Sequence, residues 1–305
     1  MWGSGSGDRA GMSEYLTTRE LAALLRVRER KVYDLVASGS LPVRRVTGKL
    51  LFPRSEIERW IGGSARARAA DMIGAAELAP PLVVAGGHDP LLEWALRESR
   101  SGIACFLDGA LDGLDRAERG ECVAVGLHVP DGDGWNTSVV EARFGREPWV
   151  LLEWARRVRG LVCRPGLARP PRRLRDVRGL RFQMRQAEAA SGLVLDRLLA
   201  AEQMSRADLA PVATVERSET DLARAIAAGR ADVGLGIAAA AQLYNLDFVP
   251  LLEERFDLMV WRRAYFDLPF QKLVSFCRGP AFEARAAELG GYDVSGCGTV
   301  RFNGR

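Results

Sequence analysis

The sequence predicts two modules of different fold: a small helical module with a β-hairpin near the N-terminus, and a larger α/β module that fills the rest of the chain. Apolar residues repeat at helical spacing before the hairpin, and strands alternate with helices after it. Charge follows the same division. Residues 14–68 contain twelve Lys and Arg against six Asp and Glu, a net charge of +6, so residues 69–305 carry −2 of the chain's total of +4. A chain of 305 residues has room for two to three domains.

The start of the chain is expected to lie outside any folded module. Residues 1–13 are rich in Gly and Ser and predict a disordered leader or tag. The sequence contains neither a signal-peptide core nor an apolar run long enough to span a bilayer. We therefore expect a cytoplasmic protein with no membrane partner.

The first module, expected over residues 14–62, opens with two short helices joined by a tight turn. Thr17 and Glu20 have capping-box spacing just before an apolar run. A second helix is predicted over residues 30–38 and ends at Gly39. The apolar positions at helical spacing are Leu21, Leu24 and Leu25 in the first helix and Val32, Leu35 and Val36 in the second. Two such helices predict a helix-turn-helix.

A hairpin and a third helix follow. Residues 41–46 and 49–52 predict two strands around a Thr47-Gly48 turn, and Arg54 opens a helix that ends near Trp60. The module resembles the excisionase and MerR-type winged helix-turn-helix family. The matching motifs are Thr18-x-Glu20-Leu21-Ala22, Val32-Tyr33-x-Leu35, Gly39-x-Leu41-Pro42 and Phe52-Pro53-x-Ser55-x-Ile57-x-x-Trp60. The resemblance implies binding to double-stranded DNA, with a dimer or a dimer of dimers reading repeated half-sites.

The basic residues of this module are candidates for DNA contact, because the start of the second helix usually meets base edges and the hairpin reaches backbone or minor groove. The expected DNA-binding residues are Thr18, Arg28, Arg30, Lys31, Tyr33, Arg44, Arg45 and Lys49. Each base alone can equally be a solvated surface residue. Their concentration on one module favours DNA.

Residues 63–81 are expected to form a linker helix, rich in Ala and closed by Pro80-Pro81. Such a helix is either a connector or part of a dimer seam. From residue 82 the pattern changes to strands at 82–85, 103–107 and 122–127, each followed by a helix or turn. This order predicts a parallel sheet with helices on both faces. Further strands are predicted over residues 150–154, 160–163, 180–183, 212–215, 231–235, 248–252 and 256–261.

Residues 82–305 resemble the PBP-like domain, a relative of type II periplasmic binding proteins found in molybdate-type regulators. The matching motifs include Gly87-His88-Asp89-Pro90, Arg159-Gly160-Leu161-Val162, Ala231-Asp232-Val233-Gly234 and Leu289-Gly290-Gly291-Tyr292-Asp293. The resemblance implies a fold of two lobes, about 82–152 with 248–305 and about 155–245, and a ligand in the cleft between them. It implies as ligand-binding residues Gly87, His88, Asp89, Asp108, Gly109, His128, Arg185, Gln186, Ser191 and Gly192. Helix N-termini facing a cleft suit an anion.

Two departures from the family pattern bear on the ligand. Gly87 stands where a Ser is usual, and residues 187–192 replace a Gly-Ser-Gly-Thr-Arg run. Fewer hydroxyl groups remain for a tetrahedral oxyanion, and Glu188 adds negative charge. Molybdate or tungstate therefore competes with a larger organic anion or a molybdenum-cofactor-like metabolite. His88 and Asp89 have a second interpretation as helix caps.

Three functional classes follow from these patterns. The first is a DNA-binding regulator that responds to a small anion. The second is a DNA-binding architectural factor whose PBP-like domain serves only oligomerisation. The third, an enzyme, is not favoured, because no catalytic or metal-binding motif occurs and no cofactor is expected. The five cysteines lie far apart in the sequence and read as apolar fillers or, alternatively, a reactive sensor thiol.

Overall fold

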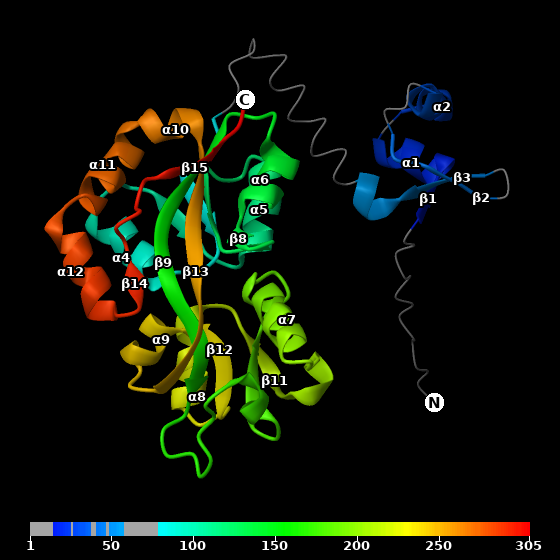
Figure 1. The fold of residues 1–305 in the computed structure, drawn as a ribbon. Helices are drawn as coiled ribbons and strands as arrows, with labels where there is room; N and C mark the ends of the chain where they lie inside the picture. The colour runs from blue at the N-terminus through cyan, green and yellow to red at the C-terminus, as the bar shows by residue number, and fades with distance from the viewer. Residues whose placement is uncertain (1–14, 26, 38–40, 47–48, 58–78) are drawn as a thin grey trace, which may run out of the picture. The chain divides into compact units, whose positions relative to one another are not determined.

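The computed structural model describes residues 15–25, 27–37, 41–46, 49–57 and 79–305. The chain divides into two compact units, Met1–Leu78 and Ala79–Arg305 (Figure 1). The expected leader and most of the expected linker helix lie outside the described residues. Within the described ranges, no helix has both the length and the apolar character of a membrane span.

Among the residues that the structure describes, the first unit contains α1, α2 and a helical stretch at residues 54–57, where the third helix is predicted to begin, together with a three-stranded antiparallel sheet of order β1-β3-β2. Its elements are β1 (Tyr15–Thr17), α1 (Thr18–Leu25), α2 (Glu29–Ala37), β2 (Arg44–Val46) and β3 (Lys49–Pro53). The predicted capping box is confirmed: the backbone N–H of Thr17 donates to Glu20 at 2.8 Å, and the N–H of Glu20 donates to the Thr17 hydroxyl at 3.3 Å. Strand β1, which no sequence pattern predicted, adds to the predicted hairpin by pairing with β3.

The core of this unit is small and follows the predicted apolar pattern at most positions. Leu21, Val32, Phe52 and Ile57 are fully buried. The prediction for Leu24 is wrong, because this side chain is 45% exposed. Leu21, Ala22 and Leu25 define the inward side of α1, and at 100° per residue position 24 falls to one side of them.

The second unit is built on one ten-stranded sheet of order β11-β10-β12-β9-β13-β6-β4-β5, with β14 and β15 also pairing with β9. Its strands are β4 (Val83–Gly86), β5 (Ala104–Phe106), β6 (Ala124–Leu127), β9 (Trp149–Cys163), β10 (Arg181–Arg185), β11 (Ala210–Glu216), β12 (Val233–Ile237), β13 (Asp247–Trp261), β14 (Tyr292–Asp293) and β15 (Val300–Asn303). The predicted parallel arrangement holds for β4–β6 and for β10–β12. It is wrong in the middle, where β9 runs antiparallel to both β12 and β13.

Helices cover this sheet, and we name two parts of the unit by their elements. Lobe 1 contains α4 (Pro90–Glu98), α5 (Ala110–Glu118), α6 (Thr137–Phe144), α10 (Arg262–Phe266), α11 (Leu268–Cys277) and α12 (Pro280–Leu289) around β4–β6. Lobe 2 contains α7 (Ser191–Ala201), α8 (Glu219–Ala227) and α9 (Ala238–Leu243) around β10–β12. Strands β9 and β13 run side by side through both lobes (Figure 1). A hairpin of β7 (Pro130–Asp131) and β8 (Gly134–Trp135) leaves lobe 1, and Trp135 packs against the apolar core of lobe 2.

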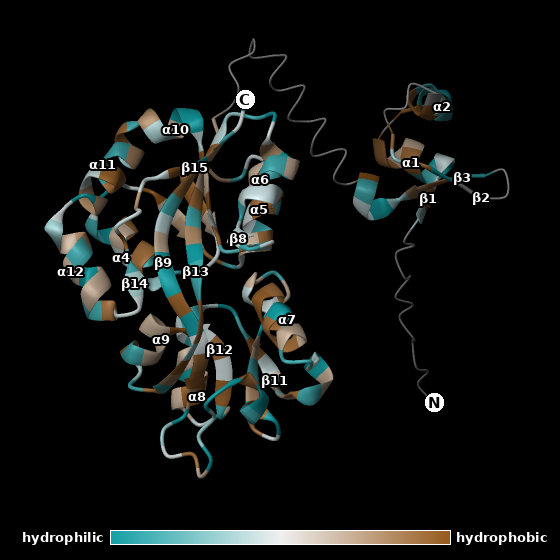
Figure 2. Ribbon diagram, in the orientation of Figure 1, coloured by the Kyte–Doolittle hydropathy of each residue, from teal (hydrophilic) through white to brown (hydrophobic). Residues whose placement is uncertain are grey.

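Each of the two long strands was predicted as two short ones, because charged residues interrupt its apolar pattern. β9 carries Arg156, Arg157 and Arg159 in its middle, and β13 carries Glu253 and Glu254. The hydrophilic stretch is visible midway along both strands in Figure 2. The register places Arg157 opposite Glu254. Opposite charges therefore meet across the ladder, and both strands continue through a stretch that resembles a loop in sequence.

Candidate ligand cleft and DNA-binding face

A fully buried ion network lies where β9 and β13 pass between the lobes. Arg157, Arg159 and Glu254 are each at most 1% exposed. The Nε of Arg157 donates to Glu254 at 2.5 Å, and the Nε and Nη2 of Arg159 donate to the same carboxylate at 2.6 and 2.9 Å. Burial alone would raise the pKa of Glu254, but the two guanidinium groups outweigh it and lower the pKa. One carboxylate thus holds two arginines in fixed orientations.

Asp89 belongs to this network, and its carboxylate accepts hydrogen bonds from several other residues of the protein. It caps α4 by accepting from the N–H of Leu92 at 2.7 Å. It also accepts from Arg157 at 2.8 Å, from the Tyr292 hydroxyl at 2.7 Å and from the Trp154 indole N–H at 3.3 Å. Asp89 therefore positions the first turn of α4 and the Arg157 guanidinium.

Glu219 extends the network into lobe 2 at the first residue of α8. Its Oε1 accepts from Arg159 at 3.0 Å. The Nη1 of Arg185 lies 2.9 Å from the same oxygen, an ion pair whose alignment falls short of a hydrogen bond. Burial disfavours the charged form, yet Arg159 and Arg185 prevail and lower the pKa of Glu219 to about 2. Arg185 also donates to the backbone carbonyls of Glu216 and Arg217 at 3.0 and 2.7 Å, so it orders the loop that leads into α8.

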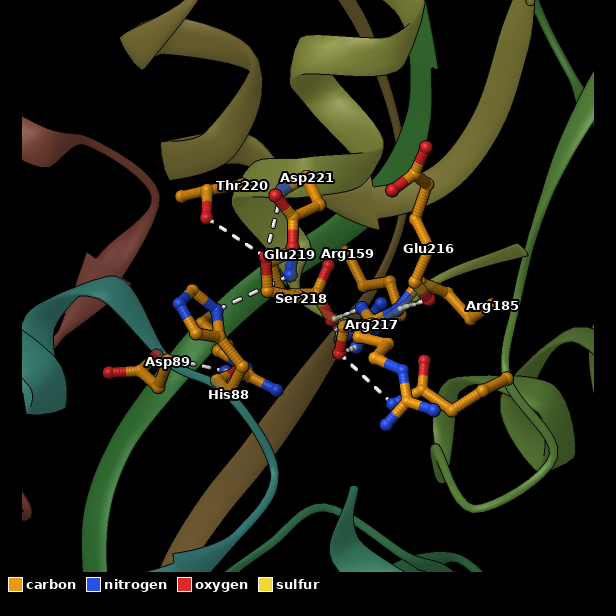
Figure 3. Close-up of polar contacts among 12 residues, drawn as sticks. His88, Asp89, Arg159, Arg185, Glu216, Arg217, Ser218, Glu219, Thr220 and Asp221 are labelled. Carbon is orange, nitrogen blue, oxygen red and sulfur yellow. Dashed lines mark hydrogen bonds and ion pairs between the residues drawn. The ribbon is translucent and has the colours of Figure 1, made fainter. Parts of the chain in front are cut away.

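His88 connects lobe 1 to this helix start (Figure 3). Its Nδ1 accepts from the N–H of Glu219 at 3.3 Å, and its Nε2 lies 3.2 Å from the Glu93 carboxylate. The contact with Glu93 holds the proton on Nε2 and leaves Nδ1 as an acceptor. A free N–H at the start of α8 is thereby occupied by a residue of the other lobe.

Three more contacts join the lobes on the same side. The Arg217 guanidinium lies 2.5 Å from the Asp108 carboxylate. The Gln186 amide donates to the Asp108 carbonyl at 3.0 Å. The N–H of Leu111 donates to the Glu188 carbonyl at 3.1 Å. Gly109, with φ of 127°, is needed here because a Cβ would come within 2.6 Å of that carbonyl oxygen. These contacts bring lobe 1 and lobe 2 together around the buried ion network.

A cavity of about 70 Å³ opens next to these contacts in lobe 2. Arg185, Gln186, Ser191 and Gly192, all predicted ligand-binding residues, line it together with Gln183. Helix α7 begins at this cavity, and Ala190 before it provides no side-chain cap. The start of α7 thus presents backbone N–H groups without a side-chain acceptor of its own.

His128 faces the network from lobe 1 and explains one departure from the family pattern. Its ring stacks on Phe256, with centroids 5.9 Å apart. A Cβ on Gly87 would lie 3.1 Å from Nδ1 of His128, a tight contact that favours glycine beside this ring. Burial, with help from Arg157 and Arg159, holds the pKa of His128 well below its ordinary value. The ring is therefore neutral at pH 7.

Several buried polar atoms of this site have no hydrogen-bond partner among the described residues. They are both ring nitrogens of His128, Nη2 of Arg157, Nη1 of Arg159, Oγ of Ser191, Oε1 of Gln183 and Gln186, and Oε2 of Glu219. Buried polar groups are paired in most proteins, so such a concentration marks a place where water or a ligand supplies partners. The charges, in contrast, are balanced: three guanidinium groups (Arg157, Arg159, Arg185) stand against three carboxylates (Asp89, Glu219, Glu254).

In the first unit, the predicted DNA-binding residues lie mainly on the surface. Arg28, Arg30 and Lys31 are exposed at the start of α2, and Tyr33 is 52% exposed one turn further on. Thr18, the first residue of α1, is half-buried, and Lys49 is exposed on β3. Arg44 is exposed but pairs with Glu56 at 2.8 Å. The side chain of Arg45 lies outside what the structure describes.

Sequence reasoning missed Arg157, Arg159, Glu219 and Glu254 as site residues; Arg159 and Glu254 entered it only as parts of motifs shared with the PBP-like family. The signal was present in the spacing. Arg157 and Arg159 are two apart within a strand, so they share one face. The arginine-rich stretch lies between the predicted strands 150–154 and 160–163, and the acidic stretch lies between 248–252 and 256–261; opposite charges in two such gaps indicate continuous strands that pair across a sheet.

Comparisons with known proteins agree with this architecture. A model of the PBP superfamily domain matches residues 93–278, and a model of a helix-turn-helix domain matches residues 15–64. The Bacillus subtilis protein YvgK, described as uncharacterized, is 24% identical over 303 residues, covering 93% of this chain and 96% of that protein. A putative phosphate ABC transporter substrate-binding protein from Clostridium perfringens, solved with bound phosphate, is similar in fold. Its TM-score is 0.50 at 9% identity, over 68% of this chain and 96% of that one. The chain therefore belongs to the PBP superfamily domain family and carries a helix-turn-helix domain ahead of that domain.

Proposed function

We propose that this protein is a transcription regulator, not an enzyme, and that a small acceptor-rich anion bound in the cleft changes its affinity for DNA. The combination of a helix-turn-helix with a PBP-superfamily domain fits a ligand-responsive DNA-binding regulator. The exposed basic start of α2 suits phosphate and base contacts. A homodimer is part of the proposal, because one winged module covers a single half-site.

The observation that carries the effector proposal is the group of unpaired buried donors around the ion network. Arg157 and Arg159 each hold an N–H group that has no acceptor in the part of the chain that the structure describes, and Ser191 and His128 add further hydrogen-bonding atoms. An effector with several acceptor atoms would satisfy these donors, and each unsatisfied buried group otherwise costs about 1–3 kcal/mol. Because the network is already balanced in charge, we propose a singly charged organic anion over a doubly charged oxyanion such as molybdate or tungstate.

A thermal-unfolding screen of the full chain tests this proposal. The panel contains molybdate, tungstate, sulfate, phosphate and a series of monocarboxylic and hydroxycarboxylic acids. An effector present at 100 times its Kd is expected to stabilise the folded protein by about 2.7 kcal/mol. We expect organic monoanions to raise the unfolding temperature more than molybdate does. The same anion should then change the affinity of the chain for duplexes that it selects from a random DNA pool.

Ser191→Ala provides the site-specific variant. Its hydroxyl has no partner among the described residues, so its removal should leave the unliganded unfolding temperature nearly unchanged while reducing the shift caused by the effector. Ser205→Ala is the matched control, because Ser205 caps a short 3₁₀ helix (Arg206–Asp208) and is not among the residues that line the cavity. If no anion raises the unfolding temperature, the result favours the alternative, a DNA-binding factor whose second unit serves only oligomerisation.

A further inference from the structure

A second cavity, of about 130 Å³, lies in lobe 1 and brings two cysteines together. Cys277 is the last residue of α11, and Cys297 lies in the turn before β15. Both thiols line this cavity, beside Glu153 and Arg278. The rest of the lining is largely apolar and includes Trp154. The fold thus brings two thiols from different elements to the wall of one small cavity.

The two thiols lie close enough that each shifts the pKa of the other. The interaction with the Cys277 thiol lowers the pKa of Cys297, although burial and the negative charge of Glu153 raise it; the positive charge of Arg278 adds a smaller lowering contribution. The same interaction, together with burial, raises the pKa of Cys277. The remaining cysteines differ: burial raises the pKa of Cys105, and it raises the pKa of Cys122 and of Cys163 to about 12.

We propose that Cys277 and Cys297 form a peroxide-reactive pair that closes to an intramolecular disulfide. The inference stands on the cavity that both thiols line, and it is independent of the proposed effector. Cys297 is assigned as the attacking sulfur, because the Arg278 guanidinium beside the same cavity favours a thiolate. Cys277 is assigned as the resolving sulfur, because it lines the same cavity and keeps its proton until the second step.

The reaction balances with one hydroperoxide. The Cys297 thiolate attacks an oxygen of the O–O bond, which breaks and gives a sulfenic acid on Cys297; the departing oxygen takes up a proton as water or an alcohol. Cys277 sulfur then attacks the Cys297 sulfur, the S–O bond breaks, and the hydroxyl group leaves as water with the Cys277 proton. Two thiols are oxidised by two electrons, and the peroxide is reduced by two.

The disulfide would enclose a segment that contacts the cleft. This segment contains α12 and Tyr292, whose hydroxyl donates to Asp89 at 2.7 Å. Asp89 in turn accepts from Arg157 of the buried ion network. Closing the segment 277–297 is therefore expected to restrict the residues that hold one side of the effector site.

Peptide mapping of the full chain tests the proposal. The reduced protein is treated with one equivalent of hydrogen peroxide, free thiols are blocked, and tryptic peptides are identified without reduction. The expected first product joins peptide 273–278 to peptide 286–301, while Cys105 stays reduced although it is the exposed cysteine. Cys277→Ser should instead accumulate a sulfenic acid on Cys297 that dimedone captures.

Cys105→Ser is the matched control and should leave the rate of peroxide consumption unchanged, whereas Cys297→Ser should slow it at least tenfold. Oxidation of Cys105 before the pair, or a reduced Cys297 after excess peroxide, would overturn the proposal. The map of the wild-type chain decides the question even where a serine variant does not fold. Because the map needs neither DNA nor effector, its result leaves the proposed regulatory function untouched.

Discussion

The two units use arginine in opposite ways. At the start of α2, Arg28 and Arg30 are exposed, and no ion pair joins them to another described residue. In the ligand unit, Arg157 and Arg159 are at most 1% exposed and bind buried carboxylates. Exposed charges act through a field that salt screens within about 10 Å at 0.1 M. Buried charges act through fixed hydrogen bonds that salt screens much less.

This difference separates two kinds of recognition. A polyanion such as DNA is attracted by many mobile cations and releases counterions when it binds. A small effector needs a few donors in fixed positions, because it makes too few contacts to order them itself. In the ion network, three carboxylates orient three guanidinium groups. Donors held in fixed positions in this way are the arrangement expected for binding a small effector.

The largest expected effect is a loss of stability in the variant Glu254→Gln, which tests the role of buried charge. The substitution leaves Arg157 and Arg159 buried without their shared carboxylate, so we expect the ligand unit to lose about 3–5 kcal/mol of unfolding free energy. Urea unfolding followed by tryptophan fluorescence measures it, because Trp94, Trp149 and Trp154 all lie in this unit.

Glu253→Gln is the matched control, since Glu253 is the neighbouring residue on the same strand. Its side chain is 57% exposed and pairs with Arg156, which is 47% exposed. Exposed ion pairs contribute about 0–1 kcal/mol. Equal losses in the two variants would contradict the distinction between buried and exposed charge in this protein.

A smaller change in stability is expected when the pH is lowered. Glu219 has a pKa of about 2 in the folded chain against an ordinary value of 4.5. A carboxyl group whose pKa is lowered by folding stabilises the folded state above its unfolded pKa, and this contribution disappears as pH falls through the folded pKa. At about 1.4 kcal/mol per pKa unit, the contribution is on the order of 3 kcal/mol.

The measurement compares wild type with Glu219→Gln in urea between pH 7 and pH 2. The stability gap between them should be widest above pH 5 and should narrow towards pH 2. A gap that stays constant over this range would show that Glu219 acts through shape and not through charge.

Sequence predicted the fold well where local patterns and the core agree. The capping box at Thr17 and Glu20 forms as expected. The sequence also predicts helices over residues 219–228 and 281–289, and α8 and α12 match them to within one residue at each end. It failed where tertiary contacts override local pattern. Strand β9 continues through Arg157 and Arg159, both of which donate to Glu254 on the neighbouring strand, and a single sequence does not show that these residues are buried.

The candidate cleft was predictable in part for the same reason. Arg185 ends β10, Gln186 follows it, and Ser191 and Gly192 begin α7, so local reasoning placed them together, and they line one cavity. The network of Arg157, Glu219 and Glu254 draws on three elements far apart in the chain. Its assembly depends on the register of β9 with β13 and on the closeness of α8, and these are properties of the folded sheet.

The smallest expected effect is a change in DNA affinity when exposed cations are removed from α2. Arg30→Ala combined with Lys31→Ala removes two exposed cations from the start of α2. If both contact phosphates, the slope of log K against log salt should become shallower by about 2, and affinity should fall by about 1–3 kcal/mol. Fluorescence anisotropy on a labelled duplex at several salt concentrations gives both quantities.

Arg44→Ala is the control and should change the slope less, because Arg44 already pairs with Glu56 at 2.8 Å. A double variant that keeps the wild-type slope would mean that α2 does not meet the DNA backbone through these residues.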